Sequence, residues 1–131
     1  MSSDNGYATR DELLSPGKRR FKDVVLPIRD VKLRIRSLME NESELFQSEM
    51  FSRGKVQTGK TVSSYRRLIV LCVCDGLNDS PLFGPNDMES LNNWDGADII
   101  YLGKECESFC GFVDGEVEKM EKNFETATAV N

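Results

Sequence analysis

The fold is decided by the stretch VKLRIRSLME (residues 31–40), in which a strand pattern gives way to a helix pattern. Apolar residues alternate here with Lys32, Arg34 and Arg36, which gives a strand one apolar face and one basic face. A serine three residues before a glutamate then forms a capping box, which predicts that a helix starts at Leu38. We therefore expect a half-buried strand followed directly by a helix.

The sequence on either side of this junction extends the pattern. Residues 22–26 are predicted to form a partner strand, and residues 27–30 contain the proline and aspartate that favour a turn between the two. Downstream, apolar residues recur at helical spacing until Gly54, which should end the helix. A β-hairpin followed by a helix is thus expected to open the fold.

The apolar run within residues 65–75 should lie at the centre of the core. From Leu68 onward the run is hydrophobic nearly all round, which is typical of a buried element. Its valines and isoleucine permit a buried strand, whereas its length and the preceding arginines favour a helix. We predict a helix here.

The C-terminal half is predicted to be helical. Gly84 and Pro85 suit the N-cap and the first position of a short helix that runs through Leu91. Apolar stripes predict further helices at residues 97–110 and 116–124. The expected fold class is α+β, mainly α-helical, with an N-terminal β-hairpin followed by four to five helices.

The chain of 131 residues has the length of one domain. Residues 1–20 are polar and bury too little to offset the entropy of ordering, so we expect a flexible N-terminal arm with at most one helical turn at residues 11–14. Residues 21–124 are expected to form a single α+β domain, and residues 125–131 a flexible tail.

The apolar segments suggest a cytoplasmic protein. The longest apolar run, residues 68–74, is too short to cross a bilayer, and the polar start lacks the apolar segment of a signal peptide. We therefore expect no membrane partner. In a reducing compartment the four cysteines, Cys72, Cys74, Cys106 and Cys110, are expected to be free thiols. A zinc site is a minor alternative that would need all four, because the chain has no histidine.

One segment, GKVQTGKT (residues 54–61), matches the Walker A pattern of nucleotide-binding loops. That loop works only between a buried strand and a helix that carries its lysine to the phosphates. Residues 44–51, which precede it here, have the pattern of an amphipathic helix. A nucleotide-dependent enzyme is therefore the most distant of the alternatives.

Other catalytic groups are also lacking in the sequence. Without histidine, a serine or cysteine nucleophile has no usual base. The acidic pairs within residues 87–89 and 116–118 fit the first turns of helices, where carboxylates complement the helix dipole. We expect neither enzymatic activity nor a cofactor.

Charge is distributed unevenly along the chain. Residues 18–36 carry eight cations against two aspartates, a net charge of +6, whereas residues 75–125 carry thirteen carboxylates against three lysines, a net charge of −10. Unlike ends attract, so Lys32, Arg34 and Arg36 are candidates for head-to-tail self-association into a ring or a spiral. The alternative is a small basic-hairpin module that binds nucleic acid. The hairpin lacks interleaved aromatic residues for stacking and the chain is acidic overall, so no nucleic acid is expected.

A protein that binds other chains needs exposed apolar surface rimmed by polar groups. The helix expected after the hairpin has more apolar residues than one stripe can bury, among them adaptable methionines. The candidate partner-binding residues are Met39, Phe46, Met50 and Phe51. Core packing is the competing interpretation for about half of them.

These features together resemble the tail assembly chaperones of long-tailed phages, over residues 10–125. The shared segments are RDELL (10–14), VKLRIRSL (31–38), RRLIVLCVCD (66–75) before a glycine-containing turn, PLF (81–83), DMESL (87–91) and VEKMEKNF (117–124). The sequence departs from the family at Gly84, where a serine or threonine cap is more usual, and at residues 29–30, where the hairpin turn usually contains a glycine.

The resemblance implies a non-enzymatic chaperone that self-associates and coats the tape measure protein. In this interpretation the chaperone keeps the long apolar helices of its client soluble until tail tube subunits replace it. The tail tube protein is thus a further candidate partner. The chaperone would act in the host cytoplasm and be absent from the mature virion.

Overall fold

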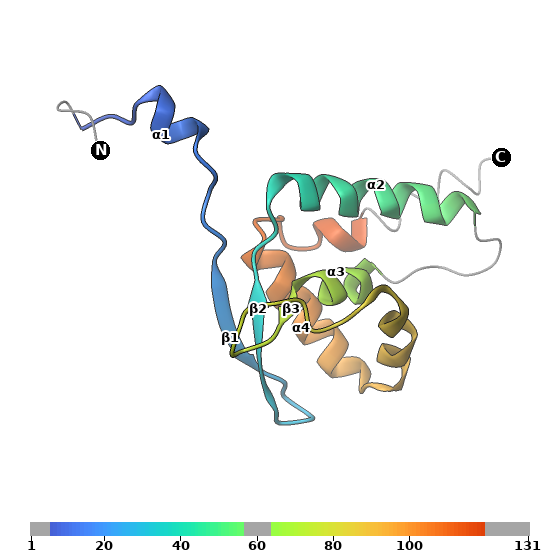
Figure 1. The fold of residues 1–131 in the computed structure, drawn as a ribbon. Coiled ribbons are helices and arrows are strands. Elements are labelled where there is room, and N and C mark those ends of the chain that lie inside the picture. The colour runs from blue at the N-terminus through green and yellow to red at the C-terminus, as the bar shows by residue number, and fades with distance from the viewer. Residues whose placement is uncertain (1–5, 57–63, 120–131) are drawn as a thin grey trace.

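A computed structural model of the protein describes residues 6–56 and 64–119, and its fold is α+β and mainly helical, as the sequence predicts (Figure 1). The elements follow one another as α1 (Arg10–Leu14), β1 (Phe21–Val25), β2 (Lys32–Arg36), α2 (Glu40–Val56), α3 (Ser64–Cys72), β3 (Val73–Cys74), the 3₁₀-helix η1 (Pro85–Asn93) and α4 (Gly96–Phe109). A further helical turn covers residues 116–119.

The three strands form one antiparallel sheet in the order β1-β2-β3. The predicted hairpin is confirmed, with Phe21 opposite Arg36 and Val25 opposite Lys32. Strand β3 corrects the expectation of an uninterrupted central helix, because α3 ends at Cys72 and the next two residues pair with β2.

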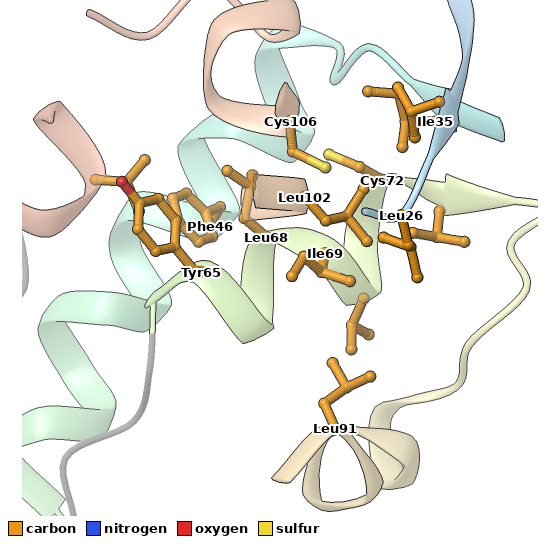
Figure 2. Close-up of a cluster of buried hydrophobic side chains, with 14 residues drawn as sticks. Leu26, Ile35, Phe46, Tyr65, Leu68, Ile69, Cys72, Leu91, Leu102 and Cys106 are labelled. Atoms are coloured by element: carbon orange, nitrogen blue, oxygen red, sulfur yellow. The ribbon is translucent and has the colours of Figure 1, made fainter. Parts of the chain in front are cut away.

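Helix α3 lies at the centre of the core, as its apolar run predicts, and packs mainly against α4 and η1. The largest fully buried apolar side chains come from the hairpin and from each long helix: Leu26, Ile35, Phe46, Leu68, Ile69, Leu91 and Leu102 (Figure 2). At the closest approach of α3 and α4, a Cβ atom on Gly103 would lie 2.5 Å from Cγ of Tyr65. Only glycine fits at that position.

The start of α2 differs from the prediction. The hydroxyl of Ser37 accepts a hydrogen bond from the backbone N–H of Arg20 at 2.9 Å, so Ser37 is engaged by the N-terminal arm rather than by the helix. The backbone N–H of Met39 instead donates to Glu42 at 2.8 Å, and the helix begins at Glu40, two residues later than expected.

The later helices begin close to the predicted positions. Gly84 is the N-cap of η1 and Pro85 its first residue, although the helix is of the 3₁₀ type. Asp95 caps α4, which starts at Gly96 rather than one residue later. Gly111, with a φ of 88°, follows the end of α4, where a left-handed conformation favours glycine.

Two buried carboxylates, Asp98 and Glu107, fasten distant segments to α4. Asp98 accepts hydrogen bonds from the backbone N–H groups of Ile28 and Arg29 at 2.9 and 3.0 Å, and so holds the hairpin turn against the start of α4. Glu107 accepts at 3.1 and 2.9 Å from two backbone N–H groups within residues 115–117. The last helical turn is thereby fixed to the same helix.

The N-terminal arm is joined to the domain more firmly than the sequence suggests. Helix α1 coincides with the turn expected at residues 11–14. Arg19 and Arg20, which we assigned to the flexible arm, hydrogen-bond to α2 and to the end of α4. The tail at residues 125–131 lies outside the described residues. Among the helices of the described ranges, none combines the length and apolar character needed to cross a bilayer.

Candidate interaction surfaces

The outer face of the hairpin presents the three cations proposed for self-association, but they differ in availability. Lys32 is 71% exposed, and its Nζ lies 3.9 Å from a carboxylate oxygen of Asp23. The side chain of Arg36 is only 12% exposed, and its Nε donates to the carbonyl of Leu71 at 3.0 Å. Of the three candidates, Lys32 is thus the side chain that points freely into solvent, whereas Arg36 is a structural residue.

Arg34 joins two carboxylates of the same molecule. Its guanidinium contacts Asp23 at 2.8 Å and Asp79 at 3.1 Å. Hydrogen bonds to Asp23 and then to Asp79 raise the pKa of Arg34 above its ordinary value. The charge of Arg34 is therefore already balanced within its own chain.

A second charge cluster surrounds Glu42 at the start of α2. Arg19 contacts the Glu42 carboxylate with two nitrogens at 2.7 and 3.2 Å, and Arg36 lies 3.7 Å away. Burial of Glu42 opposes its ionisation, but the hydrogen bonds from Arg19 and from the N–H of Met39 outweigh burial, so the pKa of Glu42 is lowered. The cluster ties the arm, the strand β2 and the helix α2 together.

Charges that lie far apart in the sequence therefore meet within one molecule. Lys22 of the basic segment pairs with Glu105 of the acidic segment at 2.8 Å, as Arg34 pairs with Asp79. The guanidinium of Arg29 also lies over the ring of Trp94, 5.0 Å from its centroid. At these positions the cations of the basic segment contact groups of the same molecule and stabilise the fold. Fewer cations are therefore available for self-association or for binding phosphate groups.

The four partner-binding candidates on α2 and directly before it are not one surface. Phe46 is fully buried and packs against Phe112, with ring centroids 6.0 Å apart, so Phe46 is a core residue and our assignment to a partner surface is corrected. Met39 is half-buried at the start of the helix. Met50 and Phe51 lie in α2, but their side chains are outside the described part of the structure. An apolar residue that we did not single out, Leu45, is 55% exposed on this helix.

A groove opens on the outer side of the sheet, and no pattern in the sequence predicts it. It has a volume of about 430 Å³ and lies between β2, at Lys32 and Leu33, and the segment after β3, at Leu77 and Leu82. Leu77 is 97% exposed at the tip of a turn, and Leu82 is half exposed. Two leucines beside an exposed ammonium group form a surface suited to an apolar segment with acidic residues.

The N-terminal arm carries a second set of exposed apolar side chains. Leu13 and Leu14 of α1 are 73% and 64% exposed, and none of the five residues of this helix, all of them described, is buried. The hydrogen bonds that cap and close α1 stay within residues 9–15. Figure 1 shows α1 standing away from the rest of the molecule, at the end of the sheet opposite the hairpin turn.

The Walker-like segment follows a helix, as the sequence predicts, and not a strand. Helix α2 continues past Gly54, where we expected it to end, as far as Val56. Residues 57–63, which include the lysine and threonine of the pattern, lie outside the described residues. The described part of this segment is thus helical, in a place where a phosphate-binding loop would need an irregular backbone.

The four cysteines are free thiols, as expected. Sγ of Cys72 lies 3.5 Å from Sγ of Cys110, and the hydrogen bond to Cys72, together with burial, raises the pKa of the Cys110 thiol. Across residues 6–56 and 64–119, no three histidine, cysteine or acidic side chains gather in the manner of metal ligands. Cys72 and Cys110 thus pack against each other where the end of α3 meets the end of α4.

Comparisons of this chain with models of protein families, with curated proteins and with solved structures found no match. Any functional inference therefore depends on the residues and surfaces of the chain itself.

Proposed function

We propose that this protein is a tail assembly chaperone of a long-tailed phage or prophage, which self-associates and coats the tape measure protein during tail assembly. The observation that carries the proposal is the exposure of large apolar side chains on the arm, on α2 and beside the groove of a small, well-packed domain. Such side chains on a folded domain mark surfaces that bind other proteins. The resemblance of residues 10–125 to this family supplies the identity of the client.

The proposed client surface is the outward side of α2. Leu45 is exposed there and Met39, the residue before the helix, is half-buried, so both can contact an apolar helix without disturbing the core. Met50 and Phe51 remain candidates on the last part of α2. A flexible methionine suits a chaperone because it adapts to different client side chains.

The remaining parts of the proposal follow from the family. The chaperone acts in the host cytoplasm, has no cofactor and catalyses no reaction. Tail tube subunits replace it on the client, so the chaperone is absent from the mature virion. A gene for a very long helical protein should follow its gene directly, and a tail tube gene should precede it.

Co-expression tests the proposal. The tape measure protein encoded beside this chain should be insoluble alone and soluble when the two are produced together, and the two should co-purify. The Leu45→Asp variant should fold normally, because Leu45 is exposed, and should lose much of this effect. As a matched control, Ile100→Asp changes an exposed apolar residue on α4, away from both α2 and the groove, and should still bind the client. A client that stays insoluble with the wild-type chain would refute the proposal.

A further inference from the structure

Helix α1 stands away from the rest of the molecule, beyond the end of the sheet where β1 begins (Figure 1), and its leucines are exposed, as is Leu77 of the groove. The arm leads into β1 at Phe21, which pairs with Arg36 at one end of the hairpin. The groove is bordered by β2 from Lys32, at the other end of the strand, to Arg34 in its middle. A contact between α1 and the groove would therefore join two different surfaces of two molecules.

The root of the arm is fixed at the end of the sheet that lies away from the groove. The backbone N–H of Arg20 donates to the hydroxyl of Ser37 at 2.9 Å, and Arg19 is held by Glu42. Gly17 lies beside Met39, because a Cβ on Gly17 would be 3.8 Å from the terminal carbon of Met39. The path of the chain is thus set up to Gly17, and only the segment before it can swing.

That segment is too short to reach the Lys32 end of the groove in its own molecule. The three residues from Gly17 back to Leu14 span at most about 11 Å when fully extended. The five residues of β2 between Ser37 and Lys32 alone extend about 17 Å in the opposite direction. While the root bonds persist, α1 cannot span the groove of its own molecule as far as Lys32, whereas the arm of another copy can lie along the whole groove.

The two surfaces match in chemistry as well as in position. Helix α1 offers two adjacent leucines behind two carboxylates, Asp11 and Glu12. The groove offers Leu77 and Leu82, and its least engaged charge is the ammonium group of Lys32. The carboxylates near the groove are already engaged, since Asp23 accepts from Arg34 and Asp75 accepts from the N–H of Leu77 at 2.7 Å.

We infer that the N-terminal helix α1 of one copy docks in the outer groove of a second copy, with Leu13 and Leu14 against Leu77 and Leu82. The contact is heterologous, so repetition gives a ring or an open spiral around a long client. The contact rests on the self-association in the proposed function. It makes the apolar arm the self-association surface, in place of the basic face of β2.

Mixing of two defective variants tests the contact most sharply. The arm variant Leu13→Asp/Leu14→Asp keeps an intact groove, and the groove variant Leu77→Asp keeps an intact arm. Each should be monomeric by light scattering coupled to gel filtration, at concentrations where the wild-type full-length chain forms oligomers. A mixture of the two should form 1:1 dimers and nothing larger, since one intact arm and one intact groove remain. The control Leu45→Asp should oligomerise like the wild type.

The outcomes separate this inference from the proposed function. A wild-type chain that is monomeric at every concentration, single variants that oligomerise normally, or a mixture that stays monomeric would each overturn the arm contact. Circular dichroism checks that each variant is folded. A charge reversal tests the contact a second time, because Lys32→Glu should weaken association and Asp11→Lys, at the exposed carboxylate of α1, should restore it. Client solubility is measured independently, so oligomers that form by the arm but leave the client insoluble would refute only the chaperone function.

Discussion

Arg34 and Asp79 form an ion pair of 3.1 Å between the hairpin and the turn after β3, 45 residues further along the chain. The basic and acidic segments that look separated in the sequence are joined here within one molecule. Charge reversal at Arg34 and Arg36 would therefore disturb the fold itself.

Arg36→Ala should destabilise the domain by about 1–3 kcal/mol, because it leaves the carbonyl of Leu71 without its side-chain donor and removes one of the two arginines near Glu42. The matched change Lys32→Ala removes a solvent-exposed cation and should alter stability by less than about 0.5 kcal/mol. Urea unfolding of both variants measures the difference. Equal stabilities would show that Arg36 is as dispensable as a surface charge.

Leu68→Ala should cost about 2–5 kcal/mol, since Leu68 is fully buried in the core and its truncation leaves a cavity. Leu71→Ala, three residues further on the same helix, should cost clearly less, because Leu71 is only partly buried. Thermal and urea unfolding should rank the two in this order. A larger loss at Leu71 would mean that α3 presents a different face to the core.

Gly103→Ala should destabilise the domain by about 1–3 kcal/mol, because the added methyl group overlaps the ring of Tyr65. Helix propensity alone predicts the opposite sign, a gain of about 1 kcal/mol for alanine over glycine. Gly96→Ala is the control, since its new Cβ meets no atom within 4 Å in the described structure. A stabilised Gly103→Ala variant would refute the close contact of α3 and α4.

Asp98→Ala should cost about 2–4 kcal/mol, because two backbone N–H groups of the hairpin turn lose their charged acceptor. Asp98→Asn retains one acceptor oxygen and should cost less. Amide hydrogen exchange should show faster exchange at Ile28 and Arg29 in the alanine variant. Unchanged protection of these two amides would contradict the anchoring role of Asp98.

Glu42 should make the stability depend on pH in the acid range. Its pKa is lowered in the folded state from an ordinary value of 4.5, so its ion pairs stabilise the fold fully above pH 4.5. This contribution is lost as the pH falls through the lowered pKa. The difference in unfolding free energy between the wild type and Glu42→Gln should therefore be constant near neutral pH and shrink below pH 4.5. A difference that grows in acid would reverse the sign of the pKa shift.

Local patterns explain which parts of the fold the sequence could predict. The alternation around Lys32 and the cap at Gly84 depend on neighbouring residues, and the structure has the hairpin and η1 where these patterns place them. Ser37 does not cap α2, because its hydroxyl accepts a hydrogen bond from the backbone N–H of Arg20, 17 residues earlier in the chain. The burial of Phe46 depends on Phe112, which no local pattern places beside it.

The candidate surfaces were less predictable for the same reason. The groove needs the turn after β3 to lie beside β2, and β3 itself is two residues long. The leucines at residues 13 and 14 stand in a short helical pattern, but their exposure depends on where the arm leaves the domain. The bond between Arg20 and Ser37 determines that position. Pairing of charges across the molecule likewise depends on tertiary contacts such as Lys22 with Glu105.

Many copies of this chain should coat one long apolar client, and native mass spectrometry of the co-purified complex can count them. The complex with the full-length tape measure protein should contain multiple copies of the chain. A tape measure protein shortened to half its length should bind about half as many, since coating scales with client length. One or two copies on both clients, or no complex at all, would contradict the claim.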